Sequence, residues 1–134
     1  MISHLTQFRV RYSETDQMGY VYYGNYAQYF EVGRVEWLRN LGISYKTMED
    51  EGVMLPVINL QVTYLKPAKY DNLLTLKTTL VKKPKVRIEF SYELFNEQEE
   101  LLVIASTELV FIDIAKNKPT KSPAQLSQKI EEIF

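Results

Sequence analysis

The residue types in this chain narrow the chemistry that it could perform. Its 134 residues include no cysteine and a single histidine, His4. A thiolate nucleophile and cysteine-ligated zinc are therefore excluded, and Ser–His–Asp triads, Cys–His pairs and multi-histidine metal sites lack the histidine that a scaffold must place. We expect His4 to be an exposed side chain of a frayed terminus. Any catalysis must then rely on carboxylates, hydroxyls, backbone N–H groups or lysine.

Candidate catalytic groups gather in the segment from Tyr12 to Tyr26, which reads YSETDQMGYVYYGNY. It contains two carboxylates, Glu14 and Asp16, within a stretch of turn-forming residues. We expect Glu14 to be a solvated loop charge. On spacing alone, Asp16 fits an Asx turn, in which the side chain binds nearby backbone, at least as well as it fits a catalytic role.

A long helix is predicted to follow this segment and to position it. Apolar residues recur at the spacing of one helical face, at Tyr26, Phe30, Gly33, Trp37 and Leu41. The predicted helix covers residues 25–41, with Asn25 as its N-cap and Gly42 as its C-terminal stop. A glycine within a helix costs roughly 1 kcal/mol relative to alanine, so we expect Gly33 to permit close approach to a sheet.

The rest of the chain predicts a sheet. A first strand is expected in Leu5–Tyr12, and a period of two or a long apolar run marks four more, at Leu60–Tyr64, Leu74–Leu80, Ile88–Leu94 and Leu102–Ile114. We expect these strands to form an antiparallel meander. Short helices are predicted at residues 44–51 and 123–134. The fold class is α+β, with residues 1–134 as one domain. Because one helix covers only part of such a sheet, we expect pairing with a second copy.

Three blocks of the sequence together resemble a known family. The second and third blocks are residues 30–38 (FEVGRVEWL) and 62–71 (VTYLKPAKYD), and the first matches at Asp16, Gly19, Val21, Tyr22, Tyr23, Asn25 and Tyr26. Their order and spacing resemble the hotdog-fold acyl-CoA thioesterases of the 4-hydroxybenzoyl-CoA thioesterase type, which include the Tol-Pal-associated acyl-CoA thioesterases. The resemblance covers nearly the whole chain. It implies a hotdog fold, in which a five-stranded antiparallel sheet wraps a long helix.

The same resemblance implies hydrolysis of acyl-CoA thioesters, with no cofactor and no metal. Asp16 would be the nucleophile or general base, and the backbone N–H of Tyr23, or of its neighbour at the helix start, would polarise the thioester carbonyl. Gly24, Asn25 and Tyr26 would build this end of the substrate pocket. N–H groups at the positive end of a helix suit the charge that develops on the carbonyl oxygen. Tol-Pal-associated members commonly carry histidine where this chain has Tyr23, so a histidine side-chain role does not transfer.

Two further features could contact the substrate. The basic run of Lys82, Lys83, Lys85 and Arg87 could meet the phosphates of coenzyme A, or it could be a solubilising hairpin. Glu31 lies where other hotdog thioesterases can place a catalytic glutamate. For Glu31 we favour a structural role, as a helix-surface charge paired with a nearby arginine, Arg34 or Arg39. The many tyrosines of the region could line an acyl pocket, although core and interface roles are favoured.

Composition restricts the partners and the location. The formal net charge of -1 argues against a broad electrostatic grip on nucleic acid or anionic lipid. The start of the chain lacks a basic and then apolar leader, and no apolar stretch approaches the ~20 residues that cross a bilayer. We therefore expect a cytoplasmic protein. From the partly covered sheet we expect a homodimer or a homotetramer. An acyl-acyl carrier protein thioesterase and a non-catalytic acyl-CoA-binding module stay open, whereas a hotdog dehydratase is disfavoured because it needs a histidine.

Overall fold

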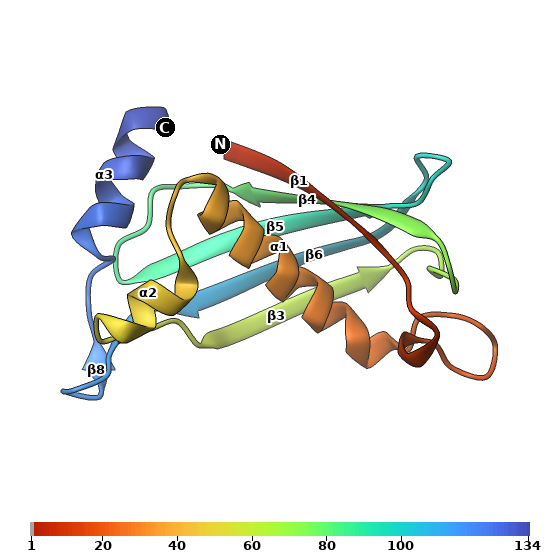
Figure 1. The fold of residues 1–134 in the computed structure, drawn as a ribbon, viewed down its shortest axis with the longest axis horizontal. Helices are drawn as coiled ribbons and strands as arrows, with labels where there is room; N and C mark the ends of the chain where they lie inside the picture. Colours follow the sequence, from red (N-terminus) through yellow and green to blue (C-terminus); the bar gives the residue numbers. More distant parts are fainter. Residues whose placement is uncertain (1) are drawn as a thin grey trace.

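A long helix lies across one face of a five-stranded antiparallel sheet in the computed structural model, which describes residues 2–134. The helix is α1 (Tyr26–Asn40). In spatial order the strands are β1 (Ile2–Arg9), β4 (Leu73–Leu80), β5 (Arg87–Phe95), β6 (Leu101–Val110) and β3 (Val57–Tyr64). Figure 1 shows α1 running diagonally across this sheet. The predicted α+β arrangement is confirmed.

Shorter elements complete the chain at both ends of α1. They are the 3-10 helices η1 (Tyr12–Glu14) and η2 (Tyr23–Asn25), the helices α2 (Tyr45–Asp50) and α3 (Ala124–Ile133), and a small sheet of β2 (Val53–Met54), β7 (Ile112–Asp113) and β8 (Lys118–Pro119). None of the helices within residues 2–134 combines the length and the apolar character that a membrane span requires.

The apolar face of α1 packs on the inward face of the sheet as the spacing predicts. Phe30 stacks on Tyr92 with ring centroids 4.7 Å apart, and Trp37 meets Phe90 edge-on at 5.2 Å. Gly33 marks the closest approach, since a Cβ atom there would lie 2.4 Å from the side-chain oxygen of Thr78. The expectation that this glycine permits close packing on the sheet is therefore confirmed.

The C-terminal end of α1 is closed by backbone hydrogen bonds. The N–H groups of Leu41 and Ile43 both donate to Leu38 O, at 2.9 and 3.0 Å, and Gly42 N donates to Arg39 O at 2.9 Å. Gly42 has a φ of 79°, a left-handed conformation that glycine adopts without steric cost. The predicted stop at this residue is confirmed.

The first strand lies earlier in the chain than the sequence predicted. β1 ends at Arg9, and the residues after it turn into η1. His4 pairs in register with Thr78 and is half-buried, so the expectation of a frayed, exposed terminus was wrong. The indole N–H of Trp37 donates to Ile2 O at 3.1 Å, which ties the start of β1 to the helix.

The predicted meander holds for only part of the sheet. β4, β5 and β6 are joined by hairpins, but β3 pairs with β6 and β1 pairs with β4. The segment after β3 turns away because its backbone has other partners: Leu65 N and Lys66 N donate to Leu102 O, and Ala68 O accepts from Val21 N. The predicted strand at Leu102–Ile114 is in fact two strands, β6 and β7, separated by the buried Phe111.

β3 is left as an edge strand with apolar side chains in the open. Within residues 2–134 it pairs on one side only. Four of its large apolar side chains have exposed fractions between 42% and 50%: Val57, Ile58, Leu60 and Tyr64. An exposed apolar edge of this kind is a surface that proteins normally cover.

Candidate active site

The segment between β1 and α1 folds into a tight loop around Asp16. Its N–H donates to Tyr20 O at 2.8 Å, and its carbonyl oxygen accepts from Gly19 N at 3.0 Å. Gly19 has a φ of 77°, a left-handed conformation that the turn needs and that glycine supplies. Thr15, just before Asp16, and Val21, just after Tyr20, pair with each other in an antiparallel bridge. The loop therefore presents Asp16 from a backbone that is hydrogen-bonded in both directions.

The two oxygens of the Asp16 carboxylate differ. Oδ1 accepts hydrogen bonds from Met18 N at 2.9 Å and Tyr20 N at 3.2 Å, which are the Asx-turn contacts considered from the sequence. Oδ2 has no hydrogen-bond donor within the described part of the chain. The turn role and a chemical role are thus compatible, because one oxygen fixes the side chain while the other stays available.

The entry to α1 supplies backbone donors close in sequence to this carboxylate. η2 begins at Tyr23, and the Asn25 and Tyr26 N–H groups bind the carbonyls of Tyr22 and Tyr23. Among residues 2–134, the N–H groups of Tyr23 and Gly24 have no acceptor. Gly24 is required for a local reason, since a Cβ there would lie 2.8 Å from the Tyr22 ring. Two unpaired N–H groups at the start of a helix can stabilise a developing negative charge.

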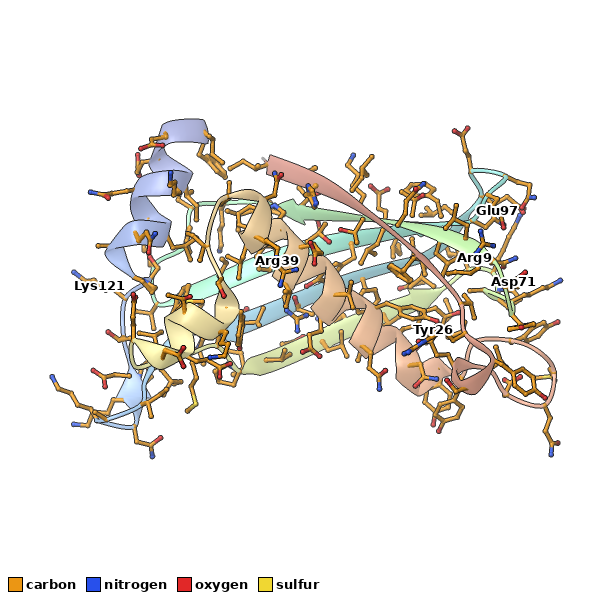
Figure 2. The ribbon with its side chains drawn as sticks, in the orientation of Figure 1. Arg9, Tyr26, Arg39, Asp71, Glu97 and Lys121 are labelled. Carbon is orange, nitrogen blue, oxygen red and sulfur yellow. The ribbon has the colours of Figure 1, made fainter. Side chains whose placement is uncertain are left out.

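A cavity of about 300 Å³ joins these groups. Its lining brings together Asp16, Tyr23 and Tyr26 from the predicted site with further residues of two segments. Tyr20 and Val21 come from the Asp16 loop, and Tyr64, Leu65, Lys66 and Pro67 come from the end of β3 and the segment after it. Figure 2 labels Tyr26, which projects from the first turn of α1 toward this region. The lining is mainly aromatic and apolar, with one carboxylate, Asp16, and one lysine, Lys66.

Asn25 and Tyr26 support the helix entry in ways that the sequence did not predict. Asn25 occupies the predicted N-cap position of α1, but its side chain makes no capping hydrogen bond: the residue has helical backbone angles, and its Nδ2 donates to Glu14 O at 2.8 Å. The Tyr26 hydroxyl accepts from Ala68 N at 3.3 Å. Burial raises the pKa of this phenol, and the Ala68 hydrogen bond partly opposes that shift.

Glu14 is buried, with an exposed fraction of 8%, so the expectation of a solvated loop charge was wrong. Its Oε1 accepts from Arg11 N at 2.8 Å and from the Tyr29 hydroxyl at 3.1 Å, and its Oε2 accepts from the Arg11 guanidinium at 3.2 Å. Burial, and after it the Glu14 charge, raises the pKa of the Tyr29 phenol, so that this hydroxyl stays protonated and donates. The Arg-x-x-Glu spacing from residue 11 to residue 14 was the sequence signal for the ion pair between Arg11 and Glu14.

The basic run lies far from this cavity within one chain. Lys82, Lys83 and Lys85 lie on the connection between β4 and β5, and Arg87 is the first residue of β5, at the opposite end of the sheet from the Asp16 loop (Figure 1). Three of them form ion pairs, with Glu89, Glu131 and Glu108 in turn. A single protomer therefore does not bring these residues to Asp16.

Glu31 lies on the α1 face that borders β3. It lines a second cavity of about 280 Å³ together with Arg34 and Leu60. The predicted ion pair of Glu31 is absent within residues 2–134: Arg39 pairs with Glu36, and Arg34 donates to the Tyr92 hydroxyl at 3.2 Å. The part of the chain that the structure describes contains no group of three or more histidine, cysteine, aspartate or glutamate side chains arranged to hold a metal.

Comparison with known proteins gives consistent matches. The family model described as Thioesterase superfamily matches residues 18–103. YneP of Bacillus subtilis, provisionally named an acyl-CoA thioesterase, is 34% identical over 113 residues, covering 84% of this chain and 82% of its own. The acyl-CoA thioesterase YbgC of Haemophilus influenzae is 31% identical over 126 residues, covering 93% of this chain and 92% of its own.

Solved structures agree with the fold. The DHNA-CoA thioesterase of Staphylococcus aureus superposes with a TM-score of 0.94 at 38% identity, covering 99% of this chain and 91% of that protein. A 1,4-dihydroxy-2-naphthoyl-CoA thioesterase of Synechocystis, Slr0204, has a TM-score of 0.89 at 22% identity and covers 98% and 97% of the two chains. The second likeness concerns the fold alone.

Proposed function

Since this chain belongs to the thioesterase superfamily and is an acyl-CoA thioesterase, we propose that Asp16 carries its catalysis. The hotdog fold expected from the sequence is confirmed by the same matches. The observation that supports this role is that Asp16 and Tyr23 line the same cavity. Within residues 2–134, Asp16 Oδ2 and the N–H groups of Tyr23 and Gly24 have no hydrogen-bond partner.

In the proposed reaction the thioester carbonyl oxygen accepts hydrogen bonds from the N–H groups of Tyr23 and Gly24. These donors are fixed before the substrate arrives, so they stabilise the oxyanion without reorganisation. In one route, Asp16 Oδ2 attacks the carbonyl carbon, the C–S bond breaks, and coenzyme A leaves as a thiolate. The resulting mixed anhydride is then hydrolysed, which releases the acid and restores the carboxylate.

A second route uses Asp16 as a general base. Oδ2 takes a proton from water, the hydroxide adds to the carbonyl carbon, and the thiolate leaves and is protonated. Both routes use the same atoms of the protein and give the same products. Hydrolysis in ¹⁸O-labelled water under single-turnover conditions identifies the covalent route if Asp16 takes up label, which happens only when water attacks the aspartyl carbon of the anhydride.

For the acyl group we propose an aromatic acid. Tyrosine rings from three segments line the cavity, namely Tyr20, Tyr23, Tyr26 and Tyr64, and flat rings favour contact with another aromatic ring. The Staphylococcus aureus relative is named for a DHNA-CoA substrate. We propose a cytoplasmic location, which the use of coenzyme A as the acyl carrier supports.

We also propose that the working unit is a homodimer formed through β3. Antiparallel pairing of two β3 edges about a twofold axis would cover the exposed apolar row from Val57 to Tyr64. A tetramer has less support, because the outward face of the sheet is polar: Ser3 binds Thr79 there at 2.8 Å, and Lys77 faces Glu93 at 4.0 Å. Analytical ultracentrifugation measures the state directly.

This dimer would change the position of the basic run. Antiparallel pairing sets opposite ends of the two sheets side by side, so the hairpin with Lys82, Lys83, Lys85 and Arg87 of the second copy would lie at the Asp16 end of the first. The phosphates of a bound coenzyme A, where they extend out of the cavity, would then contact cations from the second copy.

The test of the proposed function is thiol release from a panel of aromatic and aliphatic acyl-CoAs and one acyl-acyl carrier protein, with the wild type and Asp16→Asn. Asparagine can keep the Oδ1 hydrogen bonds to Met18 and Tyr20, so the loop is retained while the charge is removed. We expect a loss of roughly 100-fold or more in kcat. Asp71→Asn, an exposed carboxylate of another loop, is the matched control. Full activity of Asp16→Asn would refute the assignment.

A further inference from the structure

We propose that Glu14 is a positioning residue that holds Asp16 in register with the N–H groups of Tyr23 and Gly24. The inference depends on the proposed function, because it matters only if these two components act together. Glu14 touches neither of the reacting groups. Its effect is exerted through the backbone that carries them.

The burial of Glu14 needs an explanation, because a carboxylate is rarely buried unless its oxygens are fully used. It is the one charged residue among the buried side chains of residues 2–134. Its partner Arg11 is largely exposed, with a side-chain exposed fraction of 74%, so the pair is not a buried ion pair of two enclosed charges. The carboxylate is instead enclosed by backbone and by Tyr29 of α1.

The side chain and the main chain of Glu14 bind two different parts of the site. Through its carboxylate it accepts from Arg11 N, where β1 has ended, and from the Tyr29 hydroxyl on the first turn of α1. Through its carbonyl oxygen it accepts from Tyr22 N at 2.9 Å and Asn25 Nδ2 at 2.8 Å. Glu14 therefore connects the start of the loop at Arg11, the end of the loop at Tyr22, and helix α1 at Tyr29.

The spacing connects these contacts to the chemistry. Asp16 lies two residues after Glu14, and Tyr22 and Asn25 bracket the two unpaired N–H groups. Asp16 is thus within two residues of Glu14 itself, and the N–H groups of Tyr23 and Gly24 are within two residues of atoms that Glu14 binds. The distance between a nucleophile and an oxyanion donor must be correct to a fraction of an ångström, and a displacement of about 1 Å can cost on the order of 100-fold in rate.

The test compares Glu14→Ala, Glu14→Gln and Tyr29→Phe, with kcat and KM measured on the best substrate of the wild type. Alanine removes both acceptors, so we expect kcat to fall roughly 10- to 100-fold with KM within about 2-fold. Glutamine keeps an oxygen for Arg11 N and Tyr29, so it should restore kcat to within about 3-fold of the wild type. Tyr29→Phe keeps the ring contact with Phe8 and removes only the hydroxyl, and we expect an intermediate loss.

Two controls separate positioning from general stability. Glu36→Ala removes another i,i+3 ion pair with arginine, at the opposite end of α1, and should leave kcat unchanged. Leu126→Ala destabilises the buried face of α3 and should lower Tm without lowering kcat at a temperature where the protein is folded.

The inference is overturned if folded Glu14→Ala keeps the wild-type kcat, if glutamine fails to rescue it, or, where the alanine variant does not fold, if Tyr29→Phe keeps the wild-type kcat. Asp16→Asn tells this failure apart from failure of the proposed function. Loss of activity in Asp16→Asn together with a normal kcat in the Glu14 and Tyr29 variants rejects only the positioning role. Normal activity in Asp16→Asn rejects the catalytic assignment itself.

Discussion

The two ends of α1, which can be followed from Tyr26 to Arg39 in Figure 2, are built in opposite ways. At the C-terminal end, the N–H groups after the helix turn back onto its last carbonyls, and Trp37 is enclosed with an exposed fraction of 1%. At the N-terminal end, two N–H groups and one carboxylate oxygen near a cavity have no hydrogen-bond partners among residues 2–134. The contrast suggests that the closed end supports stability and the open end supports chemistry.

The largest effect should come from the closed end. Trp37→Ala removes a buried indole that packs on Phe90 and donates to Ile2 O, and we expect a loss of about 3–5 kcal/mol in the free energy of unfolding. Where the variant is still folded, its kcat should stay within about 3-fold of the wild type. Urea unfolding followed by circular dichroism, with kinetics at low temperature, measures both. A parallel collapse of kcat in the folded variant would contradict the division of roles.

The open end should give the reverse result. Asp16→Asn should cost roughly 100-fold in kcat, about 2.7 kcal/mol in the activation free energy. Its free energy of unfolding should change by no more than about 1 kcal/mol, because the Oδ1 hydrogen bonds are kept. The same urea titration provides the measurement. A stability loss as large as that of Trp37→Ala would mean that the loop is structural first.

A smaller effect is expected at Gly42. Its φ of 79° is unfavourable for any residue with a Cβ, although open space surrounds the position. Gly42→Ala should therefore lower the free energy of unfolding by about 1 kcal/mol through backbone strain alone. Gly42→Asn, which tolerates this conformation better, should lose less. Equal losses for the two variants would show that strain is not the cause.

The smallest effect concerns the basic hairpin. Replacing Lys83 with glutamine should raise KM for the acyl-CoA by about 2- to 5-fold and leave kcat unchanged, as expected for one exposed charge near a phosphate. The increase should vanish at high salt. Lys46→Gln on α2, another exposed and ion-paired lysine, is the matched control. An unchanged KM would favour the solubilising role of the hairpin.

The elements with strong periodicity were the ones that the sequence predicted well. The residues of one α1 face repeat at helical spacing, and this spacing identified both the buried face and the close approach at Gly33. The position of β3 at the sheet edge was not predictable in this way. The residues after β3 have the composition of a turn whether β4 pairs with β3 or crosses to another place in the sheet. Their path depends on hydrogen bonds to Leu102 and Val21, which are distant in sequence.

The site shows the same limit. Asp16 could be singled out through the family resemblance, and its Asx-turn contacts could be expected from its residue type. The burial of Glu14 could not, because its enclosing partner Tyr29 belongs to a helix whose packing depends on the whole sheet. Arg11, three residues away, gave a local signal for the ion pair but no signal for burial.

The register of β1 has a consequence for how the molecule assembles. Its first described residue, Ile2, pairs with Leu80, so β1 leaves the ribosome long before its partner strand exists. Contacts between such distant parts of a chain form slowly, because a large loop must close first. β1 should therefore be the last strand to join the sheet. The Trp37–Ile2 hydrogen bond would then form after the folding transition state, so it should slow unfolding more than it speeds refolding.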